Sequence, residues 1–395
     1  MFKEKNSLSW PYFDEEEVAA VRKVLESGHV NYWTGDQGKA FEKEFSNFVG
    51  VRYSIALSNG TVALELALRS CGVGSGDEVI VTPRTFMASA SSIVNVGAQP
   101  VFADVCLDSQ NITLETISEV LTDKTRAIIC VHLAGWPVEM EQIMRMANER
   151  GIFVIEDCAQ AHGATYKNKS VGSIGHIGCW SFCQDKIIST GGEGGMVTTN
   201  NKDLWLKMWS YKDHGKSWEK VHSHPPFTSF RWLHDSFGTN FRMTEMQAAI
   251  GRIQLRKLPF WQKKRYAYCN QIWQAARETE RFSAPYFACS SCEIDSDGCM
   301  GCKHAAYRSY IFVRDGGLDR DKIIEKINSR GIQCFSGSCP EVYLEGAFQK
   351  RGLEPKHRLK NAKFLGETSL AFLCHPTLQQ SEVDKTCEIL IDACR

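Results

Sequence analysis

Apolar residues in the first part of the chain follow two alternating spacings. After Asp14 they recur at helical spacing as far as Gly28, which predicts an amphipathic helix between a cap residue and a terminating glycine. Beyond it, short apolar runs alternate with helical patterns; the runs cover residues 79–81, 100–102, 127–131, 153–156, 179–182 and 196–199. This alternation is typical of a mostly parallel sheet covered by helices, an α/β fold.

The pattern changes in the last third of the chain. A long helix is predicted to start after Thr244 and to continue past Tyr266. The elements expected beyond it are an extended run at 307–313, a helix at 319–330, a run at 332–335 and a final helix from Ser381. We therefore predict a large domain of residues 1–260 and a smaller α+β domain of residues 261–395. Residues 211–237 predict a long irregular loop.

Two residues near predicted strand ends indicate a cofactor. Asp157 closes the run 153–156, and Lys186 follows another strand, just before a glycine-rich turn at 190–195. A lysine amine can form a Schiff base, and an acid can keep a pyridine nitrogen protonated. The pair predicts a site for pyridoxal 5'-phosphate (PLP), although Lys186 alone would also fit an ordinary surface turn.

Two further segments are consistent with such a site. After an extended run that ends at Ser58, a helix begins near Gly60, and free N–H groups at a helix start suit a phosphate. An ordinary helix cap is the alternative. Phe86 follows the strand 79–81, where its ring could stack on a flat cofactor or belong to the core. The order of these segments favours one assembled site.

Composition excludes several classes of partner. The 46 basic and 46 acidic residues cancel, and 43% of the residues are hydrophobic. The chain has no basic run of the kind that binds nucleic acid. It also has no apolar stretch that approaches the roughly 20 residues needed to span a membrane. The charges at residues 3–5 are unlike a signal peptide. We therefore expect a cytoplasmic protein that binds neither nucleic acid nor membrane.

Four of the 16 cysteines are unusually close together. They form two Cys-x-x-Cys pairs separated by a polar turn: Cys289, Cys292, Cys299 and Cys302. Four such thiolates could hold a structural zinc ion, with free thiols as the alternative. Most of the other cysteines stand singly in apolar strings and are expected to be small buried side chains in a reducing compartment.

Taken together, the motifs resemble the DegT/DnrJ/EryC1/StrS family of sugar aminotransferases, within the aspartate-aminotransferase fold (PLP fold type I). The resemblance extends over nearly the whole chain and is carried by residues 8–11, 15–28, 33–35, 58–61, 156–163, 181–186, 238–245 and 372–376. It implies an α/β large domain with a mostly parallel sheet, a smaller C-terminal α+β domain, PLP as the cofactor and a homodimer.

The resemblance also implies roles for individual residues. Lys186 would attach the cofactor and carry the proton during catalysis, Asp157 would bind the ring nitrogen, and Gln160 the ring oxygen. Other implied cofactor contacts are the two ring faces, covered by Phe86 and Ala159, and the phosphate, held by Gly60, Thr61, Ser181 and Asn240 of the partner subunit. Each active site would then be shared between two chains.

The implied substrates are an amino-acid donor, L-glutamate, and a sugar with a carbonyl carbon. Candidate substrate residues are Trp33, Arg242 and His375; the Arg242 guanidinium suits a donor carboxylate and equally a structural ion pair. Ala134 replaces an aromatic residue that is frequent in the family, which implies altered space near the substrate. Lysine at position 186 argues against the dehydratase branch, which has histidine there.

Several alternatives for the function remain. Trp33, Ala134 and the cysteine-rich insert are similar to the branch that aminates C8 of an oxidised 3-deoxy-manno-octulosonate for lipopolysaccharide. A nucleotide-linked 3- or 4-keto sugar is the alternative acceptor. Another class is a non-catalytic PLP-binding regulator, against which Lys186, Asp157 and Gln160 argue. A zinc-dependent interaction module around residues 289–302 would leave the other motifs unexplained.

Overall fold

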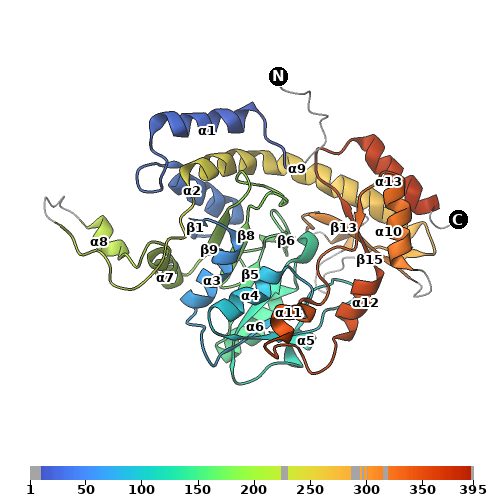
Figure 1. The fold of residues 1–395 in the computed structure, drawn as a ribbon, viewed down its shortest axis with the longest axis horizontal. Helices are drawn as coiled ribbons and strands as arrows, with labels where there is room; N and C mark the ends of the chain where they lie inside the picture. The colour runs from blue at the N-terminus through green and yellow to red at the C-terminus, as the bar shows by residue number, and fades with distance from the viewer. Residues whose placement is uncertain are drawn as a thin grey trace.

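Two sheets organise the molecule (Figure 1). The computed structural model describes residues 10–223, 230–285, 301–314 and 319–392 of the chain, together with the backbone of 294–295 and 298–299. Within these ranges a seven-stranded sheet lies in the N-terminal part and a four-stranded sheet in the C-terminal part. The remaining sheets are two-stranded ribbons.

The seven-stranded sheet has the order β1-β9-β8-β5-β4-β2-β3. Neighbours from β8 to β3 are parallel, whereas β9 runs antiparallel to both β8 and β1. The strands are β1 (Tyr53–Leu57), β2 (Glu78–Val81), β3 (Gln99–Phe102), β4 (Thr125–Val131), β5 (Phe153–Asp157), β8 (Ile177–Ser181) and β9 (Gly195–Thr199). The prediction of a mostly parallel sheet is confirmed, and the predicted runs match these strands within one or two residues at most ends.

Both faces of this sheet are buried, which explains why its strands are continuously apolar. Along β4, Ile129 packs into one core cluster while its neighbour Ile128 packs into another on the opposite face. Side chains alternate in this way because successive residues of a strand point to opposite sides. Helices supply the two covering layers.

One layer contains helices whose apolar residues share the core cluster of Ile129: α3 (Gly60–Ser70), α4 (Met87–Asn95) and α7 (Lys202–Lys212). The opposite layer contains α2 (Gln37–Val49), α6 (Met140–Arg150) and the first part of α9 (Glu245–Arg277). The predicted N-terminal helix is α1 (Glu15–Ser27), with a capping box at Asp14 and Gly28 as the left-handed C-cap. It packs against α9.

The four-stranded antiparallel sheet has the order β10-β13-β15-β14. Its strands are β10 (Phe282–Ser283), β13 (Arg308–Val313), β14 (Cys334–Phe335) and β15 (Ser369–Leu373). The helices α10 (Arg320–Ser329) and α13 (Gln380–Asp392) and the end of α9 share one core cluster with it. These elements agree with the predicted α+β character of the C-terminal part.

Helix α9 joins the two sheets without a break. Thr244 caps it with a capping box, and Pro259 lies inside it. The predicted domain boundary at residue 260 therefore falls within one continuous helix and remains a prediction. Two residues far beyond that position, Tyr343 and Phe348, pack into a core cluster of the seven-stranded sheet. The local sequence pattern does not indicate that the chain returns to this sheet.

The segment 211–237 is less irregular than the sequence suggests. Its described part contains α8 (Trp218–His222), whose Trp218 packs against Trp205 and Trp209 of α7. The expectation of an entirely irregular loop was wrong, because these aromatic contacts stabilise a short helix against a neighbouring element.

Shorter elements complete the described structure. They are α5 (Leu114–Ser118), η1 (Leu133–Gly135), β6 (Thr165–Tyr166), β7 (Lys169–Ser170), β11 (Ile294–Asp295), β12 (Gly298–Cys299), η2 (Val342–Leu344), α11 (Gly346–Gln349) and α12 (Lys360–Thr368). Among the residues described, no helix has the length and apolar character needed to cross a bilayer.

Candidate active site

A cavity of about 530 Å³ opens at the carboxyl ends of the central strands. We call it the lysine cavity. Eight residues predicted to bind the cofactor line it: Gly60, Thr61, Phe86, Asp157, Ala159, Gln160, Ser181 and Lys186. Asp157 is the last residue of β5 and Ser181 the last of β8. Ligands bind at this edge of open α/β sheets because loops from several strands meet there.

The start of α3 forms one end of the lysine cavity. The Asn59 side chain accepts the N–H of Val62 at 3.0 Å, which leaves the N–H groups of Gly60 and Thr61 without a partner among the described residues. A Cβ at position 60 would lie only 2.7 Å from Ser181 Cβ. Glycine is therefore required for close packing, and the exposed N–H groups suit an anion.

Asp157 lies deeper in the cavity and is almost fully buried. Ser89 donates to its Oδ2 at 2.7 Å, and the Ala159 N–H donates to Oδ1 at 3.1 Å. Burial raises the pKa of this carboxyl, and the two hydrogen bonds offset only part of that effect. A cationic ring nitrogen would compensate for the buried charge.

Gln160 is oriented by the backbone. Its Oε1 accepts the Ala134 N–H at 2.7 Å, so its amide nitrogen is the group left to donate into the cavity. Ala134 itself is buried with φ of 58° and is not among the described residues that line the lysine cavity. Ala134 thus orients Gln160 through its backbone N–H.

Lys186 lies in the connection between β8 and β9 and lines the same cavity as Asp157. The Phe182 N–H donates to Gly194 O at 2.8 Å, which closes the connection. Trp10 Nε1 donates to Lys186 O at 2.7 Å, so the backbone of the lysine is held in place. The side chain is 17% exposed, and it reaches the cavity from a constrained loop.

Asp185 and Tyr307 also contact this lysine, and the sequence analysis missed both. Lys186 Nζ lies 3.1 Å from Asp185 Oδ1 and 5.3 Å from the centre of the Tyr307 ring, and the Tyr307 hydroxyl donates to Asp185. Burial lowers the pKa of Lys186, but Tyr307 and Asp185 outweigh it and the net shift is upward. Asp185 directly precedes the lysine, which was the available signal.

The remaining ring contacts are less buried. Phe86 caps α4 and is 68% exposed, yet it lines the lysine cavity together with Ala159. A flat ring placed between them would meet an aromatic face on one side and a methyl group on the other. Together with the anion site at Gly60, the acid at Asp157 and the amine at Lys186, the residues present fit PLP.

The other predicted residues lie elsewhere. Asn240 is exposed and does not appear among the described residues around the lysine cavity. Arg242 Nη1 pairs with buried Asp213 at 2.8 Å, and Lys216 Nζ, which pairs with the same carboxylate, lies 4.2 Å from the Trp33 ring centre. Trp33 and Arg242 therefore share one cluster outside the cavity.

Three of the four clustered cysteines lie outside what the structure describes. Cys289, Cys292 and the Cys299 side chain are not among the residues described, so the zinc prediction is not tested there. Cys302 is buried, and its Sγ accepts the Lys167 N–H at 3.3 Å.

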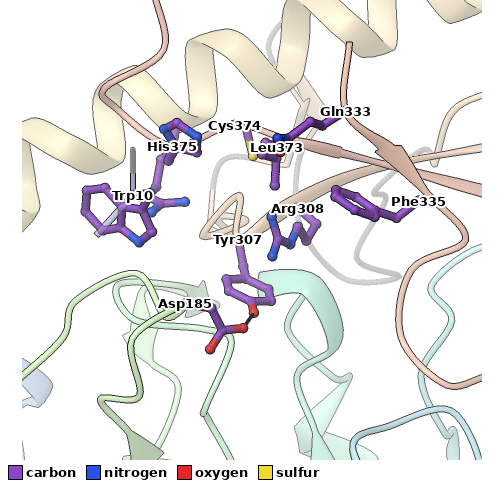
Figure 2. A pocket seen from close by; sticks show the side chains of 10 residues that line it. Trp10, Asp185, Tyr307, Arg308, Gln333, Phe335, Leu373, Cys374 and His375 are labelled. Carbon is purple, nitrogen blue, oxygen red and sulfur yellow. Dashed lines mark hydrogen bonds between the residues drawn. The ribbon is translucent and has the colours of Figure 1, made fainter. Parts of the chain in front are cut away.

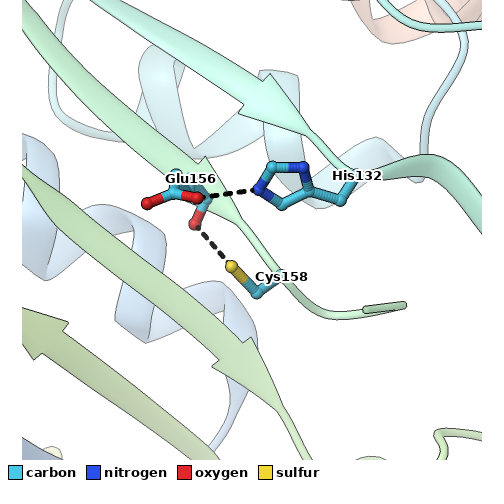
Figure 3. Close-up of side chains that lie close together, drawn as sticks. All are labelled: His132, Glu156 and Cys158. Carbon is cyan, nitrogen blue, oxygen red and sulfur yellow. Dashed lines mark hydrogen bonds and ion pairs between the residues drawn. The ribbon is translucent and has the colours of Figure 1, made fainter. Parts of the chain in front are cut away.

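A different group, His132, Glu156 and Cys158, has metal-ligand chemistry (Figure 3). Hydrogen bonds already occupy its potential ligands. His132 Nδ1 accepts the Val138 N–H at 3.0 Å, so Nε2 carries the proton and donates to Glu156 Oε2 at 3.0 Å. The same carboxylate accepts three backbone N–H groups, from Gly172, Ile174 and Gly175. The group holds the 172–175 turn, and a metal ion would have to displace these bonds.

Comparison with known proteins identifies the family. A model of the DegT/DnrJ/EryC1/StrS aminotransferase family matches residues 11–391. The chain belongs to this family. It is a PLP-dependent aminotransferase with the type I fold, and the relatives found are sugar aminotransferases. The alternatives of a non-catalytic regulator and of a zinc-dependent module therefore lack support.

Similarity to individual proteins covers nearly the full length. The X-ray structure of the aminotransferase from Psychrobacter cryohalolentis is 54% identical with a TM-score of 0.92, over 97% of this chain and 98% of that one. GDP-perosamine synthase of Caulobacter vibrioides is 33% identical over 96% of this chain and 95% of its own. Spore coat polysaccharide biosynthesis protein SpsC of Bacillus subtilis is 31% identical over 97% and 96%.

Proposed function

We propose that this enzyme transfers an amino group from an amino acid, L-glutamate, to a keto carbon of a nucleotide-linked sugar. The observation that carries the transfer is the single cavity that brings Lys186, Asp157 and the anion site at Gly60 together. The acceptor class is supported by relatives named for nucleotide-linked sugars, such as GDP-perosamine synthase.

When bound, PLP supplies an electron sink that stabilises negative charge at the substrate carbon. The protein supplies positions and protons. Asp157 lies where its carboxylate can pair with a protonated ring nitrogen. Lys186 Nζ would be the base that removes the proton from the amine-bearing substrate carbon and the acid that delivers it to C4′ of the cofactor. Asp185 orients this amine at 3.1 Å.

The proposal includes a homodimer in which Asn240 of the partner subunit reaches the phosphate. Asn240 is exposed and is not among the described lining residues of its own lysine cavity. Its Oδ1 accepts the Arg242 N–H at 3.3 Å, which holds the side chain near the surface. This placement leaves the residue available to a second chain.

A second candidate acceptor is an oxidised 3-deoxy-manno-octulosonate, aminated at C8 for lipopolysaccharide. One observation favours it: a cavity with two arginine side chains adjoins Lys186, and this sugar is a carboxylic acid. As a class, nucleotide-linked keto sugars lack this carboxylate. Their anionic group is the diphosphate.

The two acceptors can be separated directly. Purified enzyme is incubated with PLP, L-glutamate and either nucleotide-linked 3- or 4-keto sugars or the C8 aldehyde of the octulosonate. Amine products are detected by mass spectrometry, and 2-oxoglutarate is measured in parallel. We expect 2-oxoglutarate in step with a nucleotide-linked amino sugar. Amination of the octulosonate aldehyde alone would replace the first candidate by the second, and replacing glutamate by glutamine tests the donor.

A further inference from the structure

The structure contains a second cavity of about 440 Å³, and Figure 2 shows side chains that line it. Asp185 lines both cavities, so they are neighbours. We call the second one the arginine cavity. Its walls come from distant parts of the chain and include Trp10, Arg265, Tyr307, Arg308 and His375.

Among the residues that the structure describes, buried Arg265 forms no ion pair with a carboxylate. It projects from α9 and is only 2% exposed. Its Nε and Nη2 have no hydrogen-bond partner among the described residues, while its Cζ lies 4.7 Å from the centre of the Trp10 ring. Burial lowers the pKa of Arg265 to about 10, which still leaves it charged near neutral pH. An unpaired buried charge is costly, so an anion is the expected complement.

Arg308 adds a second positive charge close to the reacting lysine. It is the first residue of β13, and it pairs with no acid among the described residues. Its Cζ lies 5.0 Å from the centre of the Tyr307 ring, and Lys186 Nζ lies 5.3 Å from the same ring centre. The guanidinium and the lysine amine therefore both lie close to the same aromatic ring.

The charge balance of the arginine cavity favours an anion. Asp185 is the only acidic side chain among its described lining residues, and it already interacts with Lys186 and Tyr307. His375, a predicted substrate residue, stacks on Trp10 with ring centres 6.2 Å apart. Burial and the two arginines lower the pKa of His375 to about 3, so it stays neutral and adds no charge.

We propose that Arg265 and Arg308 form a carboxylate subsite, which holds a substrate carboxylate while the carbon that gains or loses the amine is at Lys186. Guanidinium groups suit this ligand because their planar N–H forks match the two oxygens of a carboxylate. The carboxylate can belong to the amino-acid donor or to a sugar-acid acceptor. This inference rests on the proposed function, since it assumes that both substrates visit Lys186.

Direct binding tests the subsite without turnover. The probes are glutarate, a dicarboxylate that lacks an amine, and 3-deoxy-manno-octulosonate, which has the carboxylate but no C8 aldehyde. Each is titrated calorimetrically into the PLP-loaded dimer of wild type, Arg265→Gln, Arg308→Gln and Arg256→Gln. Arg256 is the matched control because it lies on the same helix as Arg265 and is 60% exposed.

We expect wild type to bind at least one probe, and both cavity variants to weaken that binding by about 10-fold or more, as loss of a charged hydrogen bond does. Arg256→Gln should bind like wild type. Loss of glutarate binding assigns the subsite to the donor, and loss of octulosonate binding assigns it to a sugar acid. Binding of neither probe to wild type, or equal binding to all variants, would overturn the subsite. If Arg265→Gln does not fold, Arg308→Gln still tests the subsite, because Arg308 is only half-buried.

Rapid-mixing kinetics separate this subsite from the proposed function. In the glutamate half-reaction, a donor subsite predicts that Arg308→Gln raises the half-saturating glutamate concentration about 10-fold with a nearly unchanged limiting rate. Arg308→Lys should restore part of the affinity. If the variants aminate a keto sugar with wild-type glutamate affinity and also bind both probes normally, the function stands and the subsite fails. If the probes depend on the arginines but no keto sugar is aminated, the subsite stands and the proposed function fails.

Discussion

At the reacting nitrogen, a small set of side chains determines which proton form of Lys186 exists. Asp185 and Tyr307 hold the ammonium, and their combined effect raises the pKa of Lys186 although burial opposes it. Asp157 lines the same cavity and accepts two hydrogen bonds. The two functional charges are therefore held by different partners.

Covalent attachment can be tested at this lysine. Purified protein should be yellow, and borohydride should fix the cofactor to the peptide that contains Lys186, because its amine lines the cavity beside Asp157. Peptide mass spectrometry identifies the labelled residue. Lys212, which is buried with its Nζ unpaired among the described residues, is the internal control and should stay unlabelled. A label on another lysine would show the assignment to be wrong.

Asp157→Asn isolates the charge from the shape. The Asn oxygen can still accept the Ala159 N–H, and its amide can donate to Ser89, so the fold should be kept. We expect the turnover rate to fall by roughly 10²-fold, in line with a lost interaction of about 3 kcal/mol in a buried site. Steady-state kinetics at saturating PLP provide the measurement. A near-normal rate would mean that Asp157 does not contact the ring nitrogen.

The same substitution should stabilise the protein when PLP is absent. Burial raises the pKa of Asp157 in the folded state, so the folded state binds the proton more tightly than the unfolded state. Stability is then lost as pH rises from about 4, the ordinary value for Asp, through the folded value. Asp157→Asn removes this cost. Its melting temperature without PLP should exceed that of wild type at pH 7, and the difference should vanish near pH 4. An equal difference at both pH values would contradict the linkage.

At the residue scale, the sequence reveals groups that follow a recognisable strand or turn. Lys186 and Asp157 belong to this class. Tyr307 does not, because it lies 122 positions from its partner Asp185. Arg265 and Arg308 look like ordinary surface arginines in the sequence, since their burial depends on how α9 and β13 pack together. The arginine cavity forms only when these distant segments pack together, so the sequence does not reveal it.

At the scale of elements, the sequence indicates where strands lie better than which way they run. The positions of β8 and β9 were predicted, whereas their antiparallel pairing was not. Their connection contains no helix, and a parallel pair would need a crossover. The reversal matters because Lys186 then lies in a loop between two antiparallel strands and not at the start of a helix.

The contact between α3 and β8 can be tested with a single methyl group. In Gly60→Ala the new Cβ would meet Ser181 Cβ at 2.7 Å, which should displace the helix start and weaken PLP binding by about 10-fold or more, as overpacking costs 1–3 kcal/mol. Fluorescence titration of PLP into the apoprotein measures the Kd. Gly346→Ala is the matched control, because nothing lies within 4 Å of its Cβ. Equal affinities in both variants would remove the close-packing argument.

At the scale of the whole molecule, α9 connects the seven-stranded sheet with the four-stranded sheet. The general architecture was predictable, because alternating strands and helices leave few possible layer arrangements. The return of Tyr343 and Phe348 to the large core was not, since it depends on contacts between segments far apart in sequence. In the proposed homodimer, Asn240 is expected to act in the active site of the partner subunit.

Subunit mixing tests whether each active site needs two chains. Lys186→Ala and Asn240→Ala enzymes should each be inactive or nearly so. In a mixed dimer, one site combines the intact lysine of one chain with the intact asparagine of the other, while the second site carries both defects. Random assembly makes half the dimers mixed, so activity should recover to roughly a quarter of the wild-type sites.

The structure makes this result specific to Asn240. The side chain is exposed and is not among the described lining residues of its own lysine cavity, so a role within one chain would require it to move. Asp157→Asn mixed with Lys186→Ala is the control pair, because both residues line the same cavity. Each site of that mixed dimer keeps the single defect of its own chain, so mixing creates no intact site. The mixture should show no recovery beyond the average of the two parent enzymes. Absence of recovery for Asn240→Ala as well, after subunit exchange has been verified by mass spectrometry, would place Asn240 within its own chain's site or give it a structural role only.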